Sequence, residues 1–112
     1  MKKDIIFPVL ECDGRDYELR LNHKALSIWL AREGVDLGGL TALVTDYGAK
    51  ARMLQTILEL HYPDVQWEPV LDELLPREVV ELSDGVVLAA FGGGDGSGEN
   101  PPAAEAGASG TR

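Results

Sequence analysis

The chain has 112 residues, of which 45% are hydrophobic, and its formal net charge is −9. This length accommodates one small domain, and no apolar stretch approaches the roughly 18 residues needed to cross a bilayer. The single cysteine excludes an internal disulfide and a cysteine-rich zinc site, and the excess of acids disfavours binding to nucleic acid or to an anionic membrane. The two lysines near the start are soon followed by Pro8 and acids, so we expect a cytoplasmic protein without a signal peptide.

The first predicted element is a β-hairpin with strands over residues 5–12 and 15–21, joined by Asp13-Gly14. Asp-Gly between two apolar runs favours a type I′ turn, because both central residues of that turn have positive φ. A two-residue turn also fixes the register, so one set of side chains shares the face that should meet the helices. That set is Ile6, Leu10, Tyr17, Leu19 and Leu21.

The opposite face of the hairpin carries two apolar residues, Phe7 and Val9, among charged side chains. They either pack against another segment of the chain or form part of a partner-binding site. Pro8 lies between them and has no amide donor, so this strand is predicted at an edge of the sheet.

Short helices are predicted after the hairpin from their caps and apolar spacing. Asn22 is a good N-cap for the first helix and Gly34 a good end for it, because glycine adopts the left-handed conformation readily. Asp46 can cap the third helix, so we favour a break there over one kinked helix. The five helices are expected at residues 23–33, over about two turns from Leu40, at residues 47–61, in a short helix opened by the run from Asp64, and at residues 77–91.

The apolar faces of these helices predict the core. Trp29 is expected to be a core anchor beside Leu26 and Leu30, and Gly85 is expected to weaken the last helix. The last three helices should each direct one apolar face to the core. The residues of these faces are, in chain order, Ala51, Leu54, Ile57, Leu58 and His61, then Val70, Leu71, Leu74 and Leu75, then Val79, Leu82, Val86, Val87 and Ala90. The predicted fold is therefore α+β, with a hairpin and a small helical bundle over residues 1–91 and a disordered Gly/Ala/Pro-rich tail over residues 92–112.

No residue spacing in the chain predicts catalysis. Cys12 lies between acids, which disfavour a nucleophilic thiolate, and His61 precedes Pro63 at a helix end, where the helix dipole favours a histidine cap. The glycine-rich run 92–98 has no strand before it and no Lys-Ser or Lys-Thr pair after it, so a phosphate loop is not expected. We therefore expect neither an enzyme nor a site for a cofactor or metal.

Acidic residues are concentrated near the end of the predicted domain. Residues 64–91 contain seven acids and one base, Arg77. They form either a solvated surface that aids solubility or a docking surface for a basic partner.

The order of these elements resembles the tail assembly chaperones of long-tailed, siphovirus-like bacteriophages, and the related small proteins of gene-transfer agents look similar. The resemblance covers roughly residues 15–91 and consists of order and spacing, not of an invariant motif. It is carried by residues 17–22 leading into the first helix, 31–34 followed by 37–44, and 58–68 followed by 70–72.

The resemblance implies a non-enzymatic chaperone of a phage or prophage. Such a protein binds the tape-measure protein, keeps it soluble, and helps tail-tube subunits assemble around it in the bacterial cytoplasm; it is absent from the mature virion. Some members self-associate, so a homo-oligomer is one expectation. The residues expected to bind the partner are Phe7, Val9 and Trp67, because a holdase needs exposed apolar surface.

Two other readings stay open. An acidic protein that imitates DNA could inhibit a nucleic-acid-binding protein, although seven acids in residues 64–91 are sparse for such a mimic. A structural head-tail connector would remain in purified particles, where a chaperone would be missing.

Overall fold

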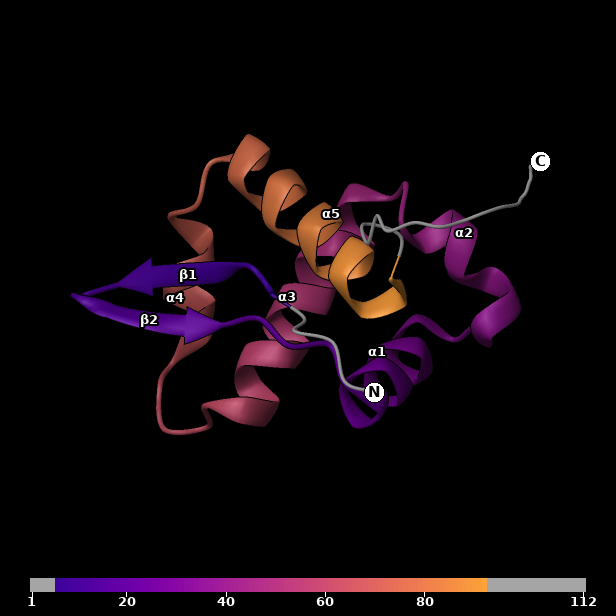
Figure 1. Ribbon diagram of the computed structural model, residues 1–112, viewed down its shortest axis with the longest axis horizontal. Helices are drawn as coiled ribbons and strands as arrows, with labels where there is room; N and C mark the ends of the chain where they lie inside the picture. The colour runs from indigo at the N-terminus through magenta and orange to yellow at the C-terminus, as the bar shows by residue number, and fades with distance from the viewer. Residues whose placement is uncertain (1–5, 93–112) are drawn as a thin grey trace.

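The computed structural model describes residues 6–92, and this part of the chain is α+β, as predicted (Figure 1). An antiparallel hairpin precedes five α-helices and one 3₁₀ turn. The predicted disordered tail, apart from Gly92, and the first residue of the predicted hairpin lie outside the described residues. The elements are β1 (Val9–Cys12), β2 (Arg15–Glu18), α1 (His23–Glu33), η1 (Leu37–Gly39), α2 (Leu40–Leu43), α3 (Tyr47–His61), α4 (Trp67–Asp72) and α5 (Pro76–Phe91).

The hairpin has the predicted turn and register. Asp13 and Gly14 have φ values of 54° and 79°, as a type I′ turn requires. Leu10 pairs with Tyr17, and the amide of Leu19 donates to the carbonyl of Pro8 over 2.9 Å. The regular ladder is shorter than predicted, because on one side it ends next to Pro8, which has no amide to donate.

The two residues before Pro8 differ in burial, and Phe7 follows the predicted alternative of packing against another segment of the chain. Ile6 is 84% exposed, whereas Phe7 is only 6% exposed. The strict alternation of a strand does not extend this far, since β1 begins at Val9, and Phe7 instead enters the protein with its ring 5.0 Å from the guanidinium carbon of Arg20. The prediction that Ile6 belongs to the core face is therefore wrong.

The predicted caps of the first and third helices are confirmed, whereas α4 begins at Trp67, later than the predicted start at Asp64. Asn22 Oδ1 accepts from the amide of Ala25 over 2.9 Å, and Gly34 ends α1 with φ of 74°. Asp46 Oδ2 accepts from the amide of Ala49 over 2.8 Å, so α2 and α3 are separate helices.

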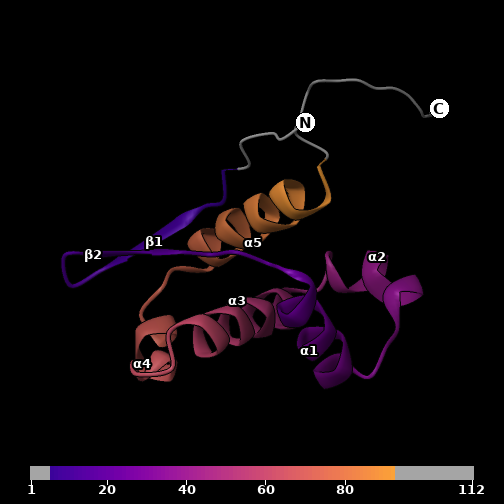
Figure 2. The same ribbon diagram turned by 60° about the horizontal axis from the view of Figure 1, so that its bottom comes forward.

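The central element of the core is α3. Figure 2 shows it running beneath α5, from α4 at one end toward α1 and α2 at the other. Trp29 of α1 is fully buried against it, and its indole Nε1 donates to the carbonyl of Ala49 over 3.0 Å. The prediction of Trp29 as a core anchor is confirmed.

Leu75, by contrast, was expected to pack inward but is exposed, because it precedes α5 and its amide donates to Glu78 Oε1 over 2.7 Å.

Gly85 marks the place where α5 meets the start of β1. A Cβ atom at this position would lie 2.8 Å from Cγ of Pro8, which is closer than such atoms approach. Glycine here weakens the helix, as the sequence indicates, but it also allows the hairpin to lie against α5.

We expect Gly85→Ala and Pro8→Ala to be strongly coupled. With Pro8 present, the new methyl group overpacks the contact, which typically costs about 1–3 kcal/mol. In the Pro8→Ala background the ring carbon is gone, so the same substitution should stabilise α5 by up to about 1 kcal/mol. Urea unfolding of the wild type, both single variants and the double variant measures this coupling. Equal effects of Gly85→Ala in both backgrounds would contradict the contact.

Candidate interaction surface

The three residues predicted to bind a partner lie in different environments. Val9 is 47% exposed on β1, whereas Trp67 is 2% exposed and Phe7 is buried beside Arg20. The expectation that Phe7 and Trp67 offer exposed apolar surface is therefore wrong. Val9 is accessible, and its role in binding stays a prediction.

Trp67 is buried because it joins the hairpin to the helices. Its ring centroid lies 4.8 Å from that of Tyr17 in an edge-to-face arrangement, and Tyr62 lies 5.0 Å from Tyr17. Its indole Nε1 donates to the carbonyl of Tyr62 over 2.9 Å, and the hydroxyl of Tyr62 donates to the carbonyl of Glu18 over 3.1 Å. We call Tyr17, Tyr62 and Trp67 the aromatic cluster.

Exposed apolar side chains flank the contact between Pro8 and Gly85. Ile6 and Val9 lie on either side of Pro8, and two residues of the last turns of α5, Leu88 and Phe91, are 51% and 47% exposed. We call Ile6, Val9, Leu88 and Phe91 the β1–α5 patch. Figure 1 shows the beginning of the described chain passing close to the middle of α5.

The sequence contained a signal for part of this patch. Leu88 is two residues beyond Val86, so it falls outside the stripe through Val79 and Val86 that faces the core. An apolar residue outside the buried stripe of an amphipathic helix is a candidate for exposure. Ile6 gave no such signal, because its exposure depends on where the strand ladder stops.

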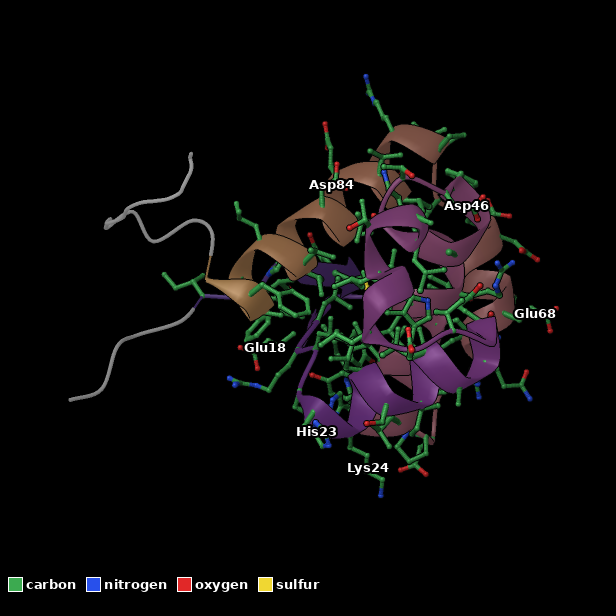
Figure 3. All side chains as sticks on the ribbon, turned by 90° about the vertical axis from the view of Figure 1, so that its right-hand side faces the viewer. Glu18, His23, Lys24, Asp46, Glu68 and Asp84 are labelled. Carbon is green, nitrogen blue, oxygen red and sulfur yellow. The ribbon has the colours of Figure 1, made fainter. Side chains whose placement is uncertain are left out.

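Exposed acids accompany Leu88 on α5. All seven acids between residues 64 and 91 are exposed, and of these Asp84 pairs with Lys50 at 3.3 Å. Glu81 and Asp84 precede Leu88 by seven and four positions, which places them on the same side of α5. Figure 3 shows Glu18, Asp46, Glu68 and Asp84 at the periphery of the molecule.

The residues considered for chemistry are dispersed. Cys12 is half-buried, His23 is exposed, and Nε2 of His61 lies 3.1 Å from the carbonyl oxygen of Arg20, so this histidine reaches the hairpin. Within residues 6–92, no group of three or more His, Cys, Asp or Glu residues could hold a metal ion. In the same part of the chain, no helix has the length and apolar character to cross a membrane.

The shortest ion pair among the described residues joins α1 to α3. Arg52 donates to both carboxylate oxygens of Glu33, at 2.6 and 2.8 Å, while the Glu33 side chain is only 7% exposed. The hydrogen bonds from Arg52 hold the pKa of Glu33 below its ordinary value, against the opposing effect of burial.

This lowered pKa predicts a pH-dependent contribution to stability. A carboxylate with a depressed pKa in the folded state stabilises the protein above its unfolded-state pKa, and the contribution disappears as pH falls through the folded-state value. We therefore expect Glu33→Gln to destabilise the protein at neutral pH and to approach wild-type stability in acid. Urea titrations between neutral pH and pH values below the glutamate range measure this. Glu81→Gln, which removes an exposed acid of α5, is the control; a pH profile of Glu33→Gln parallel to the wild type would contradict the prediction.

Comparison of the chain with protein-family models, curated proteins and solved structures found no match.

Proposed function

We propose that the protein is a tail assembly chaperone of a long-tailed bacteriophage or prophage, and that it acts by binding the tape-measure protein without catalysis. The observation that carries the proposal is the β1–α5 patch: four exposed apolar side chains on two segments that meet where Pro8 lies against Gly85, with exposed acids on the same side of α5 as Leu88. The order of a hairpin followed by short helices supports it as well, since it is the order on which the resemblance depends.

The patch has the physical properties that a holdase requires. Leu88 and Phe91 are one turn apart on α5, so an apolar client helix could contact both at once. Isolated apolar surface would also promote aggregation of the chaperone itself. The net charge of −9, with Glu81 and Asp84 on the same side of α5, opposes that association.

The proposed client is the tape-measure protein, with the tail-tube protein as the second partner. The chaperone would keep the client soluble in the host cytoplasm, present it to tube subunits, and leave before the virion is complete. Self-association of the chaperone would increase the number of patches that one client contacts.

Co-expression with the tape-measure protein from the same genome tests the proposal. We expect the client to become soluble and to co-purify with the full chain. A Leu88→Ser/Phe91→Ser variant should recover at least about tenfold less client, because truncating central apolar contacts of an interface typically costs more than about 1 kcal/mol each. Leu37→Ser is the matched control, since Leu37 is exposed on η1, outside the patch. An insoluble and unbound tape-measure protein would refute the chaperone function.

A second candidate is supported by the accessibility of all seven acids of residues 64–91. An acidic protein that imitates DNA would inhibit a DNA-binding protein, and the inhibition would weaken steeply with rising salt. Binding through the apolar patch should change little with salt.

A structural connector would remain in purified particles, whereas a chaperone would be absent from them. Mass spectrometry of such particles distinguishes the two.

A further inference from the structure

The two outer edges of the hairpin differ in whether other elements cover them. The outer edge of β2 is covered by the end of α3, where the hydroxyl of Tyr62 donates to the carbonyl of Glu18 and the ring of His61 lies within hydrogen-bond distance of the carbonyl of Arg20. Among residues 6–92, β1 pairs with β2 alone. The outer edge of β1 is therefore a sheet edge without a partner in the described part of the chain.

The register shows which backbone groups this edge presents. Successive residues of an antiparallel strand direct their N–H and C=O groups alternately toward the partner strand and away from it. The carbonyl of Pro8 accepts from Leu19, so Pro8, Leu10 and Cys12 face β2. The amides and carbonyls of Val9 and Glu11 then point outward, at the spacing that an added strand would use.

The contact between Pro8 and Gly85 determines how α5 lies relative to this edge. The chain just before β1 meets helix α5 at these residues, and the strand and the helix diverge from there toward the hairpin turn (Figure 1). Glu81 and Glu78 precede Gly85 by four and seven positions, so they lie on the same side of α5 as the residue that touches the strand. Both are exposed, and the side of α5 next to the β1 edge is thus acidic.

The hairpin itself adds an unfavourable pair of charges. Glu11 and Asp16 are directly opposite each other on the outer face, and both are exposed. Like charges in directly opposite positions destabilise a hairpin. A cation placed between the two carboxylates would remove this repulsion.

We propose that the outer edge of β1 binds an extended, basic segment of a partner polypeptide as a third strand. The amides and carbonyls of Val9 and Glu11 would pair with its backbone. Lysine or arginine side chains on its outer face would meet Glu11 and Asp16, and the aliphatic stems of these side chains would cover Val9, which lies on the same face. A second copy of this chain is a poor occupant of this edge, because its own β1 carries Glu11 and would bring a further acid beside Glu11 and Asp16. The inference goes beyond the proposed chaperone function and does not depend on it.

The first test is amide hydrogen exchange of the ¹⁵N-labelled full chain, which shows whether the backbone amides of this edge are unpaired. In the free protein, the amides of Val9 and Glu11 should exchange faster than those of Leu10 and Cys12, which donate to β2. A short acetylated peptide of alternating lysine and valine is then added. At a peptide concentration about ten times its Kd, exchange at Val9 and Glu11 should slow by about tenfold. Unchanged exchange at these two residues, or protection confined to the last turns of α5, would overturn the proposal.

A methylated peptide separates strand addition from simple charge attraction. The same peptide N-methylated at every residue keeps its charge but cannot donate from either edge, so it should fail to protect Val9 and Glu11. Protection by this methylated peptide would refute backbone pairing.

Variants of the protein test the charges. Glu11→Gln/Asp16→Asn should weaken peptide binding several-fold, whereas Asp36→Asn/Asp64→Asn removes the same charge away from β1 and should have a smaller effect. Equal losses in the two double variants would mean that net charge alone attracts the peptide, and would overturn the assignment of the site to this edge. Because these tests use a synthetic peptide, their outcome is separate from that of the tape-measure co-expression.

Discussion

Trp29→Ala is expected to lower the free energy of unfolding by about 3–5 kcal/mol, the usual cost of truncating a fully buried tryptophan. The side chain is completely inaccessible, and it crosses from α1 to α3, where its Nε1 donates to the carbonyl of Ala49. The loss is a large part of the stability of a small domain, which is typically about 5–15 kcal/mol. Urea unfolding followed by far-ultraviolet circular dichroism measures it.

Trp29→Phe separates the two parts of this effect. Phenylalanine keeps most of the apolar volume but cannot donate, so the buried carbonyl of Ala49 loses its indole partner, at a cost of about 1–3 kcal/mol. Leu37→Ala is the exposed control and should change stability by less than about 0.5 kcal/mol. If Trp29→Ala cost no more than Leu37→Ala, the described core would be wrong.

The sequence predicts local features of this fold well, because these depend on residues close together in the chain. Asp13-Gly14 determines the turn, and a two-residue turn then determines the register of the whole hairpin. Asn22 and Asp46 satisfy amides three residues ahead, so the helix starts follow from the same short range.

Features that depend on distant contacts were not predictable in this way. Phe7 and Val9 have the same place in the pattern, but only Phe7 is buried, because the strand ladder stops at Pro8 and Arg20 lies over the Phe7 ring. Met53 is fully buried although it was not assigned to the core face of α3. The helix packs against α1, α4 and α5, so a single stripe underestimates what it buries.

The same limit applies to the candidate surface. Periodicity can show that Leu88 lies outside the core stripe of α5, but it cannot show that β1 begins beside that helix. The contact between Pro8 and Gly85 joins segments that are 77 positions apart in the chain, and it decides which apolar residues form one patch. The interface proposals therefore rest on tertiary contacts, while the fold class rests largely on the sequence.

Trp67→Ala is expected to be as destabilising as Trp29→Ala, again by about 3–5 kcal/mol, and to act on the attachment of the hairpin. The substitution removes the ring that contacts Tyr17 and the donor to Tyr62, so the aromatic cluster loses the member that α4 contributes. Near-ultraviolet circular dichroism should lose most of its aromatic signal before the helical signal disappears. Trp67→Phe keeps an aromatic ring and should lose less.

The Trp67→Ala variant also shows whether Trp67 contacts a partner directly or only stabilises the fold. Because the side chain is buried, its removal should lower capture of the tape-measure protein only in proportion to the unfolded fraction, and capture should recover at lower temperature or with a stabilising osmolyte. Leu88→Ser, at an exposed position, should weaken capture with little change in the unfolding curve. If Trp67→Ala abolished capture while the protein remained fully folded, the indole would contact the partner directly, and the hairpin would have to open from the aromatic cluster to expose it.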